Sequence, residues 1–408
     1  MGPNYNRKVV SGWSNYSGTV IRHKMNENEM GYRGSKSVFI LNTVKEQRVD
    51  GSWCITPMRL RCTLMGFERN YQIKIPSKQL NRSSFSTLIH NPKSKLNPWF
   101  ITGFSDAEGC FSISIQPSAR MKTHWRVSPS FLIKLHIKDI KILENIQSTL
   151  GLGRIRKTGI QMVVFTVESF RDLQVIVDHF GKYPLISAKI LDYLLFKECF
   201  EKIKHKEHLT EEGLLKLVGL KSSLNWGLSE KLVNAFPKVV PVNKTEYIFK
   251  SIPDPFWVAG FASADGSFHV ITSTTEAHTG DIGKVILRFS INLNIREKDL
   301  IIGLVNFFNS YGHTSSNSYT VTGLETDIKY KNYSTAEKSI SLQYTKTSDI
   351  VNKIIPFFEE YPILGIKSLD FSDFQQVADI VNTKQHLTKS GFNLILKIKS
   401  SMNKNRPW

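Results

Sequence analysis

Two acidic residues, Glu108 and Asp265, end two copies of one short apolar motif, and each acid is followed by glycine. Each copy carries an aromatic residue, then Gly, Phe, a small residue, the acid, Gly and Phe in the same register. The small residues before each acid fall at i,i+4 spacing, which places them on one face of a helix. These pairs are Gly103 with Ala107 and Gly260 with Ala264. Two such helices can pack with their backbones unusually close, so we expect the two acids to lie side by side.

Two neighbouring carboxylates at helix C-termini repel each other and also meet the partial negative charge of the helix ends. A divalent cation relieves this repulsion, and hard oxygen ligands with coordinated water suit Mg²⁺, which binds phosphate oxygens and activates water. The predicted metal-binding residues are Glu108, Gly109, Asp265 and Gly266. A single acid–glycine pair could instead be a helix cap with glycine in the left-handed conformation. Two copies in register, each behind matched small residues, favour the metal site.

The duplication continues beyond the motifs. The string Lys206–Thr210 returns as Lys384–Thr388, and Tyr183-Pro184 returns as Tyr361-Pro362. These later pairs are further apart in the sequence than the two motifs, so the second half carries extra residues. We expect the extra length in long loops around Thr274–Lys284 and Ser310–Ser339. A repeat of this length exceeds any solenoid period, so the sequence predicts two sibling domains.

Both halves predict the same order of elements. A motif helix, over about residues 98–108 or 255–265, leads into a strand, a second strand, a helix, a hairpin and two closing helices. Phe111, Ile113 and Ile115 alternate with polar residues, which is the period-two pattern of a strand with one buried face. The predicted fold is therefore α+β, with two pseudo-symmetric domains, each an antiparallel sheet with helices on one face.

The predicted domain boundaries are residues 1–95 for a leader, 96–240 for the first domain and 241–408 for the second. The leader is basic, rich in Gly, Ser and Asn, and outside the duplication, so we expect it to be weakly ordered apart from a short strand near Tyr71–Ile75. The stretch from Leu214–Leu217 to Pro241 is expected to bridge the domains.

The open polar face of each sheet is the predicted DNA-binding surface, because these side-chain types bind base edges and phosphates, and a two-stranded ribbon fits the major groove. The candidates are Ser112, Ser114, Gln116, Lys134, His136, Lys138, His269, Arg288, Asn292, Asn294, Arg296, Ser341 and Gln343. Polar alternation alone is also typical of any solvated sheet. The near absence of acids at these positions and a net charge of +19 over 408 residues favour nucleic acid.

Composition also argues against other classes of protein. No apolar run approaches the roughly 18 residues that span a bilayer, and the N-terminus lacks the apolar core of a signal peptide. We therefore expect no membrane partner. The four cysteines, Cys54, Cys62, Cys110 and Cys199, lack zinc-ligand spacing. We expect buried thiols in a reducing compartment.

The two motifs and their surroundings resemble the LAGLIDADG homing endonucleases, in the single-chain form with two fused domains, from about Leu96 to Asn405. The strings Ile142–Thr149, Lys182–Ile186 and Leu224–Leu228 resemble the fungal mitochondrial branch, and Gly31–Ser37 with Val44–Ser52 resemble the lead-in coding sequence of its intron reading frames. This resemblance implies a monomer, made inside the mitochondrion, that cuts both strands of a long asymmetric DNA site and promotes intron mobility.

The resemblance also implies that Glu108 and Asp265 are catalytic metal ligands and that Lys346 is a basic catalytic residue near the cleaved phosphate. Three positions depart from the family pattern: Asp265 is shorter than the usual Glu, Ser169 stands where the first half could carry a basic residue, and Leu293 replaces a polar residue. Two alternatives share this fold. One is an intron maturase, which would bind its own intron RNA, and the other is a DNA-binding relic with impaired cleavage.

Overall fold

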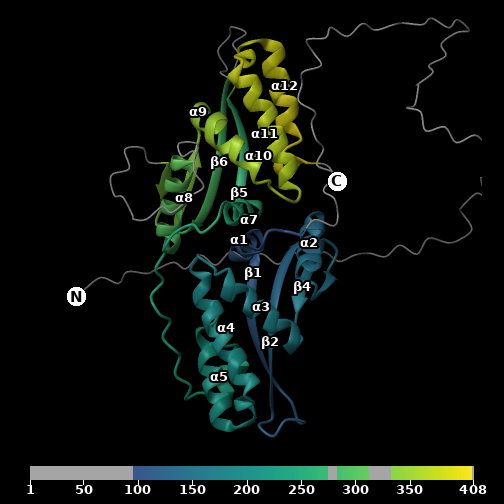
Figure 1. Cartoon of the computed structure of the whole chain (residues 1–408), viewed down its shortest axis with the longest axis vertical. Coiled ribbons are helices and arrows are strands. Elements are labelled where there is room, and N and C mark those ends of the chain that lie inside the picture. Colours follow the sequence, from purple (N-terminus) through teal and green to yellow (C-terminus); the bar gives the residue numbers. More distant parts are fainter. Residues whose placement is uncertain (1–94, 274–282, 312–331, 407–408) are drawn as a thin grey trace, which may run out of the picture. The chain divides into compact units, whose positions relative to one another are not determined.

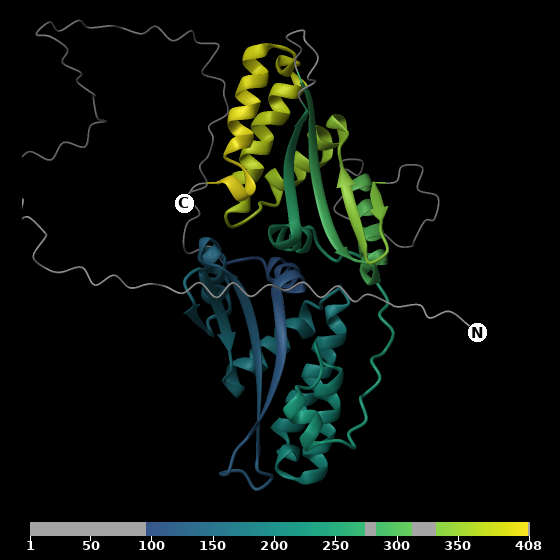
Figure 2. The same ribbon diagram turned by 180° about the vertical axis from the view of Figure 1, so that it is seen from behind.

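The computed structural model describes residues 95–273, 283–311 and 332–406. The leader, its expected strand at Tyr71–Ile75, and most of the two expected long loops lie outside the described residues. In the first half the elements are α1 (Pro98–Glu108), β1 (Gly109–Pro117), β2 (Trp125–His136), α2 (Ile140–Leu150), β3 (Arg154–Thr158), β4 (Met162–Val167), α3 (Phe170–Lys182), α4 (Lys189–Lys204), α5 (Glu211–Ser223) and α6 (Glu230–Ala235). Figure 1 and Figure 2 show them from opposite sides.

The second half repeats this order without an equivalent of α6. Its elements are α7 (Pro255–Asp265), β5 (Gly266–Ser273), β6 (Lys284–Asn294), α8 (Lys298–Ser310), β7 (Tyr333–Thr335), β8 (Ser339–Tyr344), α9 (Thr347–Asp349), α10 (Ile355–Glu360), α11 (Lys367–Asn382) and α12 (Lys389–Ser400). One turn of π-helix joins α9 to α10 just before Pro356, which has no N–H to donate. The region between α8 and β7 spans residues 311–332, whereas residues 151–153 suffice between α2 and β3, so extra length does fall here.

Each half contains one four-stranded antiparallel sheet, as predicted. The strand orders are β1-β2-β4-β3 and β5-β6-β8-β7. The registers also correspond, because Gly109 pairs with Ile133 and Gly266 pairs with Ile291. The helices pack on one face of each sheet and leave the other face open (Figures 1 and 2).

The phenylalanine that ends each motif is the centre of an aromatic cluster. Phe111 packs on Phe131, Phe180, Tyr193 and Phe196 at ring-centroid distances of 5.2–5.4 Å. Phe268 has four equivalent partners: Phe289, Phe358, Phe371 and Phe374. Both rings are fully buried. Since each ring lies three residues after its acid, this packing fixes where the motif helix ends and the strand begins.

Two expectations about the helices were wrong. More than two helices follow each hairpin: α3 to α6 in the first half and α9 to α12 in the second. In the first half, residues 170–182 form the amphipathic helix α3, whose Leu173, Ile176, Val177 and Phe180 are buried. The expected bridge from Leu214–Leu217 is instead part of α5, where both leucines belong to the core of the first half. Residues 236–254 contain no described helix or strand and connect α6 to α7.

The ends of two predicted strands also differ from the prediction. β2 stops at His136 and β6 at Asn294, and each is followed by a 3-10 turn, Ile137–Asp139 or Ile295–Glu297. The side chains of His136 and Asn294 accept hydrogen bonds from the backbone N–H two residues on, at 3.2 and 3.1 Å. Such local capping competes with continuation of the strand. Alternating polarity continued through both turns, so the strand ends could not be seen in the pattern.

Candidate nuclease active site

The two motif helices, α1 and α7, pack directly against each other, as their small residues predicted. A Cβ atom on Gly103 would lie 2.0 Å from the Trp257 carbonyl oxygen, and one on Gly260 would lie 2.2 Å from the Phe100 carbonyl oxygen. No larger residue fits at either position without moving backbone. Ala107 packs against the core of the second half and Ala264 against the core of the first. The helices therefore approach backbone to backbone and bring their C-termini together.

The glycines after the acids are not left-handed caps. Gly109 and Gly266 have φ of −69°, with ψ of 146° and 150°, so the chain passes straight from helix into strand. Glycine is required here for space, since a Cβ atom would lie 2.6 Å from the Ser105 carbonyl oxygen or 2.5 Å from that of Ala262. The structure therefore excludes the helix-cap alternative for both motifs.

Glu108 and Asp265 lie within electrostatic reach of each other. Burial raises the pKa of Glu108, and the negative charge of Asp265 raises it further. Burial likewise raises the pKa of Asp265, and the positive charges of Lys367 and Lys189 oppose that shift. No group of three or more His, Cys, Asp or Glu side chains that could hold a metal occurs among the described residues.

Two partly buried lysines complete the cluster, and neither was predicted from the sequence. Lys189 donates from Nζ to the carbonyl oxygens of Ala107 at 2.8 Å and Ser105 at 3.2 Å. Lys367 donates in the same way to those of Ala264 and Ala262. Each ammonium thus neutralises the negative end of a motif helix. Burial lowers the pKa of both lysines, that of Lys367 to about 8, against the charges of the two acids.

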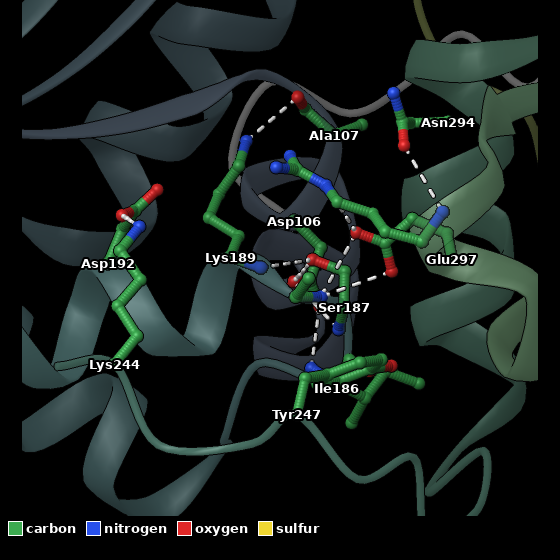
Figure 3. A network of polar contacts seen from close by, with 12 residues as sticks. Asp106, Ala107, Ile186, Ser187, Lys189, Asp192, Lys244, Tyr247, Asn294 and Glu297 are labelled. Atoms are coloured by element: carbon green, nitrogen blue, oxygen red, sulfur yellow. Dashed lines mark hydrogen bonds and ion pairs between the residues drawn. The ribbon is translucent and has the colours of Figure 1, made fainter. Parts of the chain in front are cut away.

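A buried polar network holds the segment before Lys189 (Figure 3). The Asp106 carboxylate accepts hydrogen bonds from Ile186 N at 3.0 Å, Ser187 Oγ at 2.6 Å and Trp257 Nε1 at 2.8 Å. Trp257 belongs to α7, so this bond crosses between the two halves. Tyr247, from the connecting segment, donates from its hydroxyl to the Ile186 carbonyl oxygen at 2.5 Å. Burial raises the pKa of Asp106 despite these donors.

The second half achieves the same hold with different residues. Ser263 occupies the position equivalent to Asp106, and its Oγ accepts from Leu364 N at 3.0 Å. Gly365 stands where the first half has Ser187. Asp106 and Ser187 in the first half thus correspond to Ser263 and Gly365 in the second. Each pair holds the segment that precedes the lysine of its own half.

The described strands of both sheets are free of acids, although Glu168, the residue after β4, forms a 3.8 Å ion pair with Arg156. None of the eight strands in the described part of the chain contains Asp or Glu. In the first half Ser112 and Ser114 face Ser130 and Ser128 across β1 and β2, and Gln116 faces Arg126. Lys134 faces Val164, which in turn faces Arg156 on β3. In the second half His269 faces Arg288, Asn292 faces Ser341, and Asn294 faces Ser339.

The structure corrects the predicted interface at several positions. Lys138 and Arg296 lie in the 3-10 turns and not on strands, and the side-chain acceptors of His136 and Asn294 cap those turns. Ser341 is nearly buried and accepts a hydrogen bond from Gln343 Nε2 at 3.0 Å. Three exposed arginines were missed on the first sheet: Arg126, Arg154 and Arg156. The signal for Arg154 and Arg156 was the alternating string at residues 154–158, and Arg126 lies near the start of β2.

Lys346 forms no hydrogen bond or ion pair with Glu108 or Asp265 in the described part of the chain. It is exposed at the start of α9, where its backbone carbonyl accepts from Asp349 N and Ile350 N. The lysine charges that act on Glu108 and Asp265 are those of Lys189 and Lys367. Ser169, the equivalent of Lys346, caps α3 through its hydroxyl at 3.1 Å from Asp172 N. The catalytic role of Lys346 remains a prediction that no contact with the acids supports.

Two smaller expectations have mixed outcomes. Cys199 is buried as expected, with its pKa raised to about 12, whereas Cys110 is exposed because it falls on the outer face of β1. Cys54 and Cys62 lie outside the described residues. No helix in the described ranges is long and apolar enough for a membrane span.

The family model described as LAGLIDADG endonuclease matches residues 101–200 and 258–378, one stretch in each half. This chain belongs to that family. It is 38% identical to "Probable intron-encoded endonuclease 3" of Neurospora crassa, over 96% of this chain and 74% of the relative. This match therefore extends into the leader.

Solved structures of the family show the same fold. The LAGLIDADG meganuclease I-CpaMI bound to uncleaved DNA is 47% identical, with a TM-score of 0.68 over 76% of this chain and all of that one. The homing endonuclease I-SmaMI bound to cleaved DNA is 39% identical, with a TM-score of 0.69 over 77% of this chain and 99% of that one.

Proposed function

We propose that this protein is a site-specific endonuclease that cuts both strands of a long asymmetric DNA site and requires a divalent metal, with Mg²⁺ as its physiological ion. One observation carries the proposal: two acids end two helices that pack backbone to backbone, between two sheets whose strands contain no acid. The DNA-bound states of I-CpaMI and I-SmaMI support the same reading of this chain. Intron mobility in the mitochondrion would be its biological role, as the intron-encoded relative suggests.

The donor set fits a hard divalent cation. Glu108 and Asp265 offer carboxylate oxygens whose pKa values are raised by burial, so both acids are poorly compensated without a cation. Because the protein supplies few ligands, positions would remain for water and phosphate oxygens, as Mg²⁺ requires. When bound, the metal would activate water and neutralise charge on the attacked phosphate.

The protein's own residues would perform three tasks. The two acids would hold the metal, and Lys189 and Lys367 would supply positive charge beside it while keeping both helix ends neutral. The open faces of the sheets would bind DNA, with Arg126, Lys134, Arg156 and Arg288 near phosphates or base edges. The domain division at residues 96–240 and 241–408, and the monomeric state, are part of this proposal.

Glu108→Gln tests the function directly. The variant keeps the shape and removes the charge, so we expect it to abolish double-strand cleavage while DNA affinity stays within about tenfold, because the sheets supply most phosphate contacts. Cleavage would be measured with Mg²⁺ and DNA that carries the uninterrupted host-gene junction. A variant that cuts at the wild-type rate would remove Glu108 from the active site. A wild-type protein that binds intron RNA and leaves this DNA intact would support the maturase alternative instead.

A further inference from the structure

Helices α4 and α11 have no capping side chain at their N-cap residues, although Ser187 Oγ accepts a hydrogen bond from Lys189 N at 3.2 Å. Their N-cap residues, Ala188 and Ile366, have no side chain that could accept a hydrogen bond. The first N–H groups of a helix need an acceptor from elsewhere. Both helices carry an active-site lysine as their first residue, so the way in which these N–H groups are satisfied bears on the site.

The acceptor in each case is a carboxylate from the opposite half. Both oxygens of Glu297 accept from Ala188 N at 3.1 Å, which Figure 3 shows beside Ser187 and Lys189. Asp139 Oδ1 accepts from Ile366 N at 2.7 Å. Glu297 and Asp139 are equivalent residues, since each ends the 3-10 turn that follows β6 or β2. The two contacts are therefore reciprocal, and we call them the crossed caps.

In each crossed cap, the length of the acid matches the size of the residue beside the N–H that it caps. A Cβ atom on Gly365 would lie 2.4 Å from Asp139 Oδ1, so glycine lets the shorter acid reach Ile366 N. The first half has Ser187 at the equivalent position, and there the longer Glu297 makes the contact. The Glu297 side chain is only 10% exposed, and its one ion pair in the described structure is a 3.7 Å contact with the exposed Arg296. Capping Ala188 N is thus its main polar contact.

In both helices the capped N–H group belongs to the residue directly before the lysine. Lys189 follows Ala188 and reaches the Ala107 carbonyl oxygen, next to Glu108. Lys367 follows Ile366 and reaches the Ala264 carbonyl oxygen, next to Asp265. A shift at the start of α4 or α11 therefore moves the ammonium group directly.

We propose that Glu297 and Asp139 are positioning residues for the active-site lysines, each of which aligns the lysine of the opposite half. This inference rests on the proposed nuclease function. Each acid accepts a hydrogen bond from the first turn of a helix that belongs to the other half. Asp139 in addition acts on Glu108 and Lys367 through its charge, and Glu297 acts on Lys189 in the same way. Correct placement of Lys189 thus requires the second half to be docked, and correct placement of Lys367 requires the first.

The test compares cap variants with lysine variants in the full-length protein. Lys189→Met and Lys367→Met first define how loss of each lysine changes the two strand-nicking rates on target plasmid with Mg²⁺. We expect Glu297→Ala to reproduce the strand bias of Lys189→Met and Asp139→Ala that of Lys367→Met. The affected rate should fall about tenfold to a hundredfold, since misplacement by about 1 Å has an effect of that order. DNA affinity, measured with Ca²⁺ in place of Mg²⁺, should stay within about threefold, because the sheets are untouched.

A second measurement needs no activity. Amide hydrogen exchange of the segment 186–190 in the metal-free protein should accelerate in Glu297→Ala and stay unchanged in Asp139→Ala. Glu297→Gln keeps an acceptor oxygen and should restore both exchange and strand bias. Should Glu297→Ala fail to fold, Glu297→Asp serves instead, because Ser187 keeps a shorter acid from approaching as Asp139 does.

Three results would overturn the proposal: unchanged exchange in Glu297→Ala (or in Glu297→Asp, where it replaces that variant), equal slowing of both strands, or a loss of DNA affinity that accounts for the slower cutting. Failure of the proposed function has a different signature. In that case the wild-type protein would not cut the target, whereas the exchange experiment would still report on the crossed caps.

Discussion

At the scale of single residues, the candidate active site brings together charged groups, each of which alone would destabilise the folded protein. Glu108 and Asp265 are largely buried and repel each other, and both sit where the motif helices are already negative. Lys189 and Lys367 occupy the carbonyl groups at those helix ends, so their charges are shared between backbone and acids. This arrangement leaves a deficit of positive charge at the acids, which a divalent cation would fill.

This shortage of positive charge predicts that the stability of the metal-free protein falls as Glu108 loses its proton. Burial raises the pKa of Glu108 in the folded metal-free protein, so the folded state binds its proton more tightly than the unfolded state. The protonated Glu108 therefore contributes fully to stability below its pKa in the unfolded state, which is about 4.3. This contribution is lost as pH rises through the pKa of Glu108 in the folded state. Glu108→Gln is uncharged throughout and should melt higher than the wild type near pH 8, by about 2–4 °C per kcal/mol gained.

Thermal melts with a chelator at pH 4 and pH 8 check this expectation, with Asp265→Asn as a matched variant of the same sign. The gain should shrink at pH 4. Added Mg²⁺ should raise the melting temperature of the wild type and not that of Glu108→Gln, because only the wild type keeps both carboxylates. A Glu108→Gln protein that melts lower at pH 8 would show that the lysines alone compensate the acids.

The sequence predicted the acids and glycines of the candidate site but not its lysines. Acids and glycines repeat within one short motif, where helical spacing links them. Lys189 and Lys367 repeat too, at the same offset as Tyr183 and Tyr361, yet they are remote from the motifs in sequence. Their role depends on helix-end carbonyl groups that only the folded chain brings to them. Lys346 was assigned by resemblance alone, and the structure provides no contact with the acids in its favour.

At the scale of elements, the predictions succeeded where one periodicity dominated. The motif helices and the two sheets with one open face follow from spacing of the apolar residues. The strand ends did not, because His136 and Asn294 continue the alternation while their side chains cap a turn. A turn of π-helix, Ile350–Ile354, separates α9 from α10, which carries Pro356 in its first turn, whereas α3 is continuous. Equivalent segments of the two halves therefore carry different local signals.

The α1–α7 contact is the element-scale feature most sensitive to substitution. Gly103→Ala would place a methyl group 2.0 Å from the Trp257 carbonyl oxygen, so the helices must separate. We expect a loss of at least about 1–3 kcal/mol of unfolding free energy, the usual range for overpacking, together with loss of cleavage. Chemical denaturation and the plasmid assay measure the two effects.

Gly181→Ala is the matched control. Gly181 lies in helix α3, is exposed, and has no atom within 4 Å of an added Cβ. Alanine there should stabilise the protein by about 0.4–1 kcal/mol and leave cleavage unchanged. Equal effects of the two substitutions would show that the motif helices can separate without cost, contrary to their close packing here.

At the scale of the whole molecule, the duplicated halves have diverged in matched sets. The buried pair Asp106 and Ser187 corresponds to Ser263 and Gly365, and the crossed caps use Glu297 in one direction and Asp139 in the other. Each difference between the halves is accompanied by a second difference, and together they preserve the hydrogen bond to the segment before the lysine. The halves therefore keep the same backbone geometry with different side chains.

The motif acids are an exception, because no second change accompanies the shorter Asp265. Gly109 and Gly266, the residues after the acids, have nearly identical backbone angles. These backbone angles give no compensation for the missing methylene, so we expect the two halves to present their carboxylate oxygens at different depths. Mg²⁺ demands near-octahedral geometry, and a misplacement of about 1 Å can lower a rate on the order of a hundredfold.

We therefore expect the two strands to be cut at unequal rates. A nicked intermediate should accumulate on supercoiled target plasmid, with one strand always cut first, and end-labelled strands would identify it. Asp265→Glu should bring the slower rate toward the faster one, because it restores the missing methylene, whereas Glu108→Asp should slow the faster strand. Equal strand rates in the wild type, with no nicked species in the time course, would show that the carboxylate of Asp265 already reaches the geometry that the metal requires.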